Sequence, residues 1–259
     1  MKFDNLLNLL NNLLTYPGNG VYTVQTAKEY KDLLTQKMYD SKNNSADLNI
    51  ESLWRDSLEN LEHINVPVLL GICSDCGGGI QRGANWGPLF VRSKLVEHFG
   101  ENYKDQYFDL GDIRVIPHLL HDSMLSDHQI SKSRKALYDN EQSPFPVSPL
   151  SMTELVVENL LKYKNDLKLF SIGGDHSVSY PLVKPFLRSK KESQKRVGLI
   201  HFDAHTDLLI ERLGVDYVFG SWTYHILDDL TDRKDCIQIG IRSSGKTKEY
   251  WESTMGVQQ

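Results

Sequence analysis

The sequence predicts an α/β fold built on a mostly parallel β-sheet. Short apolar runs that are typical of buried strands alternate along the chain with longer segments of helical periodicity. Polar segments, two of them glycine-rich, follow directly after several of these runs, as they do at the carboxyl ends of parallel strands. With 259 residues and no internal repeat, the chain has the length of one large α/β domain.

The composition excludes several classes of partner. A net charge of −5 shows no electrostatic footprint for binding to nucleic acid or to an anionic membrane. No stretch approaches the roughly 18 consecutive apolar residues that a membrane-spanning helix needs. Three cysteines without an export signal predict free, buried thiols and a cytoplasmic location.

The N-terminal quarter is predicted to be helical. Leucines recur at helical spacing over residues 1–14, which indicates an amphipathic helix. Two further helices are predicted over 26–38 and 48–63, on either side of a polar stretch at 40–47. We therefore expect residues 1–63 to form a helical extension packed on a main domain of residues 64–259.

The main domain is predicted to contain five strands, at residues 66–72, 107–112, 167–172, 197–202 and 236–241. Helices are predicted between them, at residues 88–99, 151–165, 180–189 and 220–229. Gly77–Gly79 follow the first strand, and their spacing favours a close-packed turn over a phosphate-binding loop. His118, His121 and His128 have no strand or carboxylate context, so we expect them at the solvated surface.

The most informative polar cluster follows the strand at 197–202. Asp203, His205 and Asp207 occupy alternate positions, and two carboxylates with an imidazole at a buried strand end indicate a divalent metal. A straight strand would separate Asp203 from Asp207 by roughly 13 Å. Paired catalytic metals lie only about 3.5–4 Å apart. We therefore expect the strand to end near Asp203 and the chain to curl around the site.

A second polar cluster, Gly173–Ser177, follows the strand at 167–172 and contributes His176. Sites in parallel sheets form beyond the carboxyl ends of strands, so His176 is predicted to meet Asp203, His205 and Asp207 in space. Oxygen ligands with some imidazole and no thiolate favour Mn²⁺, while zinc, cobalt and nickel stay open.

The two motifs Gly-Gly-Asp-His-Ser and Asp-Ala-His-Thr-Asp resemble those of the ureohydrolases, the family of arginase, agmatinase and formiminoglutamase. The resemblance extends over residues 64–257. It includes Gly87-Pro88 with Arg92, Asp109–Asp112 and Gly240–Ser243. It implies a three-layer α/β/α fold and a centre of two Mn²⁺ ions. In that centre His176 and Asp207 would bind one metal, His205 the other, and Asp203 would bridge them.

The resemblance also implies a reaction. A hydroxide bridging the metals would attack the carbon of a small guanidino or formimino compound and expel an amine. Asp207 would relay a proton to that amine, and Asp175 would support the turn before His176. The resemblance is further compatible with a homo-oligomer.

Two features of the sequence depart from the family pattern. The Ser-x-Asp-x-Asp-x-x-Asp-Pro motif, which supplies two more metal-binding aspartates, does not occur before Gln259. We therefore expect an arginase-like fold that is incomplete at its C-terminal side, with exposed strand edges and one weakly held metal or none. Phe219 also stands where the family has a catalytic histidine, and His225 is the candidate to replace it.

These departures keep two functions open. One is a metal-dependent hydrolase, for which Leu208 and Leu209 make arginine a poor substrate because they replace polar residues that arginases use toward the amino-acid carboxylate. The other is an inactive member of the fold that binds a metal or a protein without catalysis. A nucleotide-binding role for Gly77–Gly79 is the least favoured interpretation.

Overall fold

The structure is a computed structural model that describes residues 1–20, 27–39, 50–80 and 82–259. Its strands are β1 (Leu14–Thr15), β2 (Val68–Gly71), β3 (Phe108–Ile113), β4 (Leu169–Ile172), β5 (Leu199–Phe202) and β6 (Cys236–Ile239). Its α-helices are α1 (Phe3–Leu13), α2 (Lys28–Met38), α3 (Ile50–Leu58), α4 (Gly87–Phe99), α5 (Tyr103–Gln106), α6 (Asp127–Tyr138), α7 (Pro149–Tyr163), α8 (Ser179–Glu192) and α9 (Lys248–Met255).

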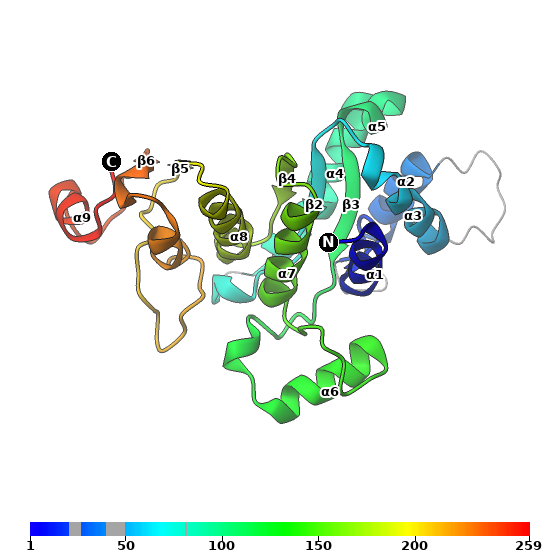
Figure 1. Cartoon of the computed structure of the whole chain (residues 1–259), viewed down its shortest axis with the longest axis horizontal. Helices are drawn as coiled ribbons and strands as arrows, with labels where there is room; N and C mark the ends of the chain where they lie inside the picture. Colours follow the sequence, from blue (N-terminus) through cyan, green and yellow to red (C-terminus); the bar gives the residue numbers. More distant parts are fainter. Residues whose placement is uncertain (21–26, 40–49, 81) are drawn as a thin grey trace.

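Four strands form a sheet in the order β1-β3-β2-β4, in which only β1 runs antiparallel to its neighbour (Figure 1). Successive side chains of β2 point to opposite faces of this sheet. Val68 and Leu70 pack in a core with α1 and α7, whereas Leu69 packs in a second core with α2 and α4. Helices therefore cover both faces of the sheet, and the predicted three-layer α/β/α fold is confirmed.

The other two strands, β5 and β6, pair in parallel as a separate sheet (Figure 1). Among the described residues, β4 bonds only to β2 and β5 only to β6, so each has an open edge. One face of the small sheet carries exposed apolar side chains: Ile200, Phe202, Ile237 and Ile239. The expected exposed edges are thus found at β4 and β5, and the expected apolar surface is found on β5 and β6.

The predicted strands are all present, and their observed ends lie within two residues of the predicted ones. Among the described strands and α-helices, four were not predicted: β1, α5, α6 and α9. Strand β1 has only two residues and therefore no readable period, and α6 has few apolar residues. The predicted helix at 220–229 is wrong in type, because the chain forms a 3-10 helix over Tyr224–Asp229. Residues 26 and 40–49, on which parts of the helix and loop predictions fall, lie outside the described residues.

The N-terminal region is joined to the sheet by a buried charge network. Arg92 of α4 is fully buried and bonds to both Asp109 and Asp112 of β3. Asp112 also accepts hydrogen bonds from the backbone N–H groups of Gly18 and Gly20, at 2.9 and 3.0 Å. Residues 1–20 are thereby fixed against the main sheet, although a domain boundary at residue 63 stays a prediction.

The cysteines are free, as predicted. Cys73 and Cys236 are buried and Cys76 is half-buried, and burial raises the pKa of all three thiols, that of Cys236 to about 12. These thiols are therefore largely protonated near neutral pH and weakly nucleophilic.

None of the described helices combines the length and the apolar character that crossing a bilayer requires.

Candidate metal centre

The turn after β4 positions His176. Gly174 leaves no room for a side chain, because a Cβ there would lie 1.8 Å from the carbonyl oxygen of Ser74. The carboxylate of Asp175 then accepts the backbone N–H of Ser177 at 2.8 Å and caps the short 3-10 turn His176–Val178. This close approach of two loops, with the cap, turns the His176 imidazole beyond the end of the strand.

The chain after β5 curls as predicted. Strand β5 ends at Phe202, and the carboxylate of Asp203 accepts the backbone N–H of His205 at 3.0 Å. Asp207 adopts the left-handed region with a φ of 51°, a conformation uncommon for any residue except glycine, asparagine and aspartate. The curl replaces the separation of a straight strand and brings both carboxylates to one place.

The two motifs meet at His176. Its Nδ1 atom lies 3.0 Å from Oδ2 of Asp203 and 2.8 Å from Oδ2 of Asp207. Burial opposes charging of this imidazole. The hydrogen bond and charge of Asp207, with the charges of Asp203 and Asp175, outweigh that opposition and raise the pKa of His176. Burial alone would raise the pKa of Asp203. The backbone N–H of His205 and the imidazoles of His176 and His201 outweigh burial, so the pKa of Asp203 is lowered.

A histidine that the sequence interpretation missed completes the cluster. His176, His201, Asp203 and Asp207 each offer a donor atom, and these atoms lie within 4.8 Å of one another. His201 belongs to β5, two residues before Asp203, and therefore points to the same face of the strand. Its signal in the sequence is one polar residue inside the run 197–202, whose apolar character alone predicts a buried strand.

The predicted ligand His205 lies at the edge of this group. Its side chain is 61% exposed, and its Nδ1 is 3.3 Å from Oδ1 of Asp203, the carboxylate oxygen that faces away from His176. Asp203 thus has imidazoles on both of its oxygens, whereas Asp207 contacts only His176 among the histidines.

His225 is not brought to the cluster. Its Nε2 lies 2.9 Å from the carbonyl oxygen of Ile210 and 3.0 Å from that of Asp216, so this nitrogen donates to the backbone of the loop that precedes the 3-10 helix Tyr224–Asp229. Its ring packs on Tyr217, with 5.1 Å between ring centroids. Phe219 is half-buried, and the guanidinium of Arg212 lies 5.5 Å from the centre of its ring.

Trp222 forms an aromatic wall beside the cluster. Its ring lies 5.1 Å from that of His176 and 5.0 Å from that of His201, measured between centroids. Its indole N–H donates to Oδ2 of Asp207 at 2.8 Å. The indole therefore excludes solvent from one side and fixes the orientation of one carboxylate.

The structure also tests the predictions made for Gly77 and for the histidines of residues 118–128. A Cβ at Gly77 would lie 2.4 Å from Oγ of Ser177, so this glycine serves close packing, as predicted. The prediction that all three histidines of residues 118–128 are solvated is wrong for His121. Its half-buried ring lies 4.4 Å from that of Tyr217, and burial lowers its pKa.

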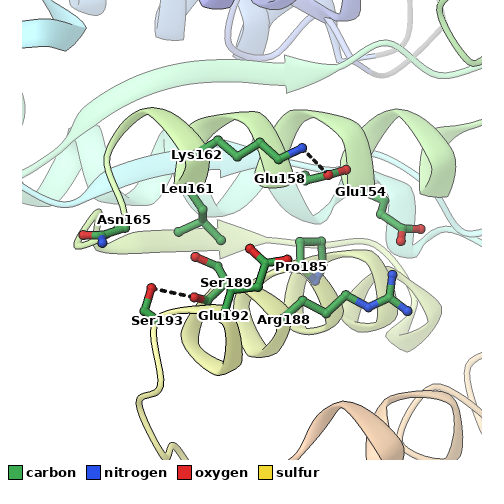
Figure 2. Close-up of a pocket in the computed structure, with 10 residues that line it drawn as sticks. All are labelled: Glu154, Glu158, Leu161, Lys162, Asn165, Pro185, Arg188, Ser189, Glu192 and Ser193. Carbon is green, nitrogen blue, oxygen red and sulfur yellow. Dashed lines mark hydrogen bonds and ion pairs between the residues drawn. The ribbon is translucent and has the colours of Figure 1, made fainter. Parts of the chain in front are cut away.

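A groove of about 330 Å³ lies elsewhere, between α7 and α8 (Figure 2). Its walls carry charged side chains of both signs, including Glu154, Lys162 and Arg188, and none of the cluster residues. Lys162 pairs with Glu158 along its own helix, which is typical of a solvated helix surface. The groove is therefore separate from the candidate metal centre and contributes no residue to it.

Fold and cluster together define a class of protein. Carboxylates and imidazoles that converge beyond the ends of parallel strands are donors for a divalent cation. The molecule is therefore an α/β protein with a candidate metal centre. The Arginase family model matches residues 66–259, three quarters of the chain, and the chain belongs to this family.

Similar proteins of known name agree with that assignment. The arginase of Glycine max is 27% identical over 196 residues, which cover 76% of this chain and 51% of that protein. The mitochondrial guanidino acid hydrolase of Homo sapiens is 38% identical over 78 residues, which cover 30% of this chain and 21% of that protein. The chain thus spans about half the length, or less, of these relatives.

Solved structures support the fold. Formimidoylglutamase from Bacillus subtilis superimposes with a TM-score of 0.52 and 21% identity, over 75% of this chain and 54% of that one. Arginase from Medicago truncatula also gives a TM-score of 0.52, at 18% identity, over 99% of this chain and 67% of its own.

Proposed function

We propose that the chain serves a metal-dependent hydrolase of the ureohydrolase type, which cleaves a C–N bond of a small linear guanidino or formimino compound. The observation that carries the proposal is the contact of one imidazole nitrogen, Nδ1 of His176, with the carboxylates of both Asp203 and Asp207. The names of the similar proteins, arginase and guanidino acid hydrolase, support this substrate class.

The donor set fits a divalent cation. Two carboxylates directed at one imidazole, without a lysine or arginine among the described groups in contact with them, leave negative charge that a cation would balance. We propose Mn²⁺, held by His176, Asp203, His205 and Asp207. When bound, such a metal supplies Lewis acidity that lowers the pKa of water toward neutrality.

The chain's own residues would then handle protons. The carboxylate of Asp207 is buried and held by the indole N–H of Trp222, which suits it to pass a proton to the leaving amine. His225 is the second proposed proton carrier. It would have to release the carbonyls of Ile210 and Asp216 before its Nε2 could reach a substrate.

The test is Mn²⁺-dependent release of urea or formamide from a panel of guanidino and formimino compounds by the 259-residue protein. Asp207→Asn should lower the rate by roughly 10²–10⁴-fold, the usual contribution of general acid–base catalysis, while the exposed Asp127→Asn should not. A protein that binds Mn²⁺ and turns over no member of the panel would contradict the proposal.

A second candidate function is binding of a metal or a protein without catalysis. Phe219 occupies the position at which the resemblance implies a histidine, and His225 is bonded to backbone carbonyls. Metal titration separates the two functions. Two tightly bound equivalents of Mn²⁺ would argue against the inactive form, and one weak equivalent with no turnover would support it.

A cytoplasmic location and self-association as a homo-oligomer also stay proposals. The three free thiols support the first. The apolar surface of β5 and β6, which includes Ile200 and Phe202, is compatible with the second.

A further inference from the structure

A chain of hydrogen bonds, buried where it passes through Gln238 and His201, leads from β6 to the candidate metal centre. The side-chain amide nitrogen of Gln238 lies 2.6 Å from the carbonyl oxygen of Thr206 and 3.1 Å from Nδ1 of His201. Its side-chain oxygen accepts a hydrogen bond from the side-chain amide nitrogen (Nε2) of Gln259 at 2.9 Å. At the other end of the chain, Nε2 of His201 lies 3.3 Å from Oδ2 of Asp203.

The orientation of the Gln238 amide follows from these neighbours. A backbone carbonyl can only accept a hydrogen bond, so the group facing Thr206 must be the nitrogen of Gln238. The same nitrogen faces Nδ1 of His201, which therefore accepts as well. Both side chains are buried, at 2% and 4% exposure, which leaves little access for solvent to replace these bonds.

This arrangement determines the tautomer of His201. A neutral imidazole carries its proton on one nitrogen only, and Nδ1 is the acceptor here, so the proton is on Nε2. The Nε2–H group then donates to Asp203. The doubly protonated ring would direct Nδ1–H at the N–H of Gln238, an unfavourable contact between two donors.

We propose that His201 is a positioning residue, which donates a hydrogen bond to Asp203 and does not bind the metal. A ligating nitrogen must present a lone pair, whereas one nitrogen of His201 carries a proton and the other accepts from Gln238. In the same way, the indole N–H of Trp222 donates a hydrogen bond to Asp207. Each carboxylate of the pair thus has its own buried N–H donor.

This inference rests on the proposed metal-binding role of Asp203 and does not depend on turnover. The first measurement is ¹⁵N NMR of the histidine rings in the metal-free 259-residue protein. We expect the His201 ring to show a protonated Nε2 and an unprotonated, hydrogen-bonded Nδ1. In Gln238→Glu the new carboxylate can only accept, so Nδ1 should become protonated. A wild-type ring protonated on Nδ1 would overturn the inference.

The second measurement is Mn²⁺ affinity by calorimetry for two variants of His201. His201→Gln keeps an N–H donor and should remain within about threefold of wild type. His201→Leu removes the donor and should weaken binding by about 10–100-fold, the usual effect of losing a partner that orients a ligand. The exposed His118→Leu is the matched control.

Equal, large losses in both His201 variants, with unfolding curves that show both to be folded, would make His201 a ligand and overturn the inference. If wild type binds no Mn²⁺, the proposed metal function fails. The NMR result still decides whether His201 is the donor to Asp203.

Discussion

Strands β2 and β5 have the same length and the same alternation of side chains, but their surroundings differ. In β2, Val68, Leu69 and Leu70 are all fully buried, because helices cover both faces of the four-stranded sheet. In β5, Ile200 and Phe202 are 59% and 74% exposed, and His201 between them is 4% exposed. Only one face of β5 is covered by other residues. The most buried residue on that face is the polar His201.

This difference indicates that the four-stranded sheet mainly stabilises the fold, whereas the two-stranded sheet carries residues of the candidate metal centre. The four-stranded sheet has apolar residues on both faces and contributes the larger share of the hydrophobic core. The two-stranded sheet presents Asp203 and Asp207 from the loop after β5, and it is held by a smaller apolar cluster. Two-stranded sheets are marginal alone, so substitutions in the two regions should have different consequences.

The largest effect on stability is expected from Arg92→Ala, which removes a buried partner of the four-stranded sheet. The substitution leaves the buried carboxylates of Asp109 and Asp112 without their cation, and breaking such a pair typically costs about 3–5 kcal/mol. Urea unfolding should show this loss in the free energy of unfolding. A loss below about 1 kcal/mol would mean that solvent or another group compensates those charges.

A matched pair tests the comparison directly. Leu70→Ala should lower the free energy of unfolding by about 2–5 kcal/mol, because it opens a cavity in the core between β2 and α7. Ile200→Ala, on the exposed face of β5, should change it by no more than about 0.5 kcal/mol. Similar losses at the two positions would show that the face of β5 is covered in solution.

Trp222→Phe should have an intermediate effect that falls mainly on the metal centre. It removes the N–H donor to Asp207 and keeps most of the apolar ring, so stability should fall by about 1 kcal/mol. Mn²⁺ affinity should fall by at least about tenfold. Calorimetric titration measures the affinity, and an unchanged value would exclude a positioning role for the indole.

The smallest effect is expected from Arg196→Ala. Arg196 forms an exposed ion pair with Asp235 at 2.7 Å, and water and salt screen such pairs. The urea midpoint should stay within experimental error at physiological ionic strength. A clear shift would show that this link between β5 and β6 matters more than its exposure indicates.

Local patterns predicted much of this molecule. Apolar runs located β2 to β6, and the two polar motifs predicted the meeting of His176 with Asp203 and Asp207. Features that depend on distant partners were not predictable. β1 exists because two residues pair with β3, and His201 is oriented by Gln238, 37 positions away. His225 is held by carbonyls of a loop that carries no periodic signal.

The candidate centre draws His176 from the loop after β4 and its carboxylates from the loop after β5, so its donors come from two different sheets. A cation held there would act as a cross-link between the two sheets. Its binding free energy would be added to their coupling, about 2.7 kcal/mol when its concentration is 100 times the Kd. Metal loading would then make separation of the two sheets less favourable by that amount.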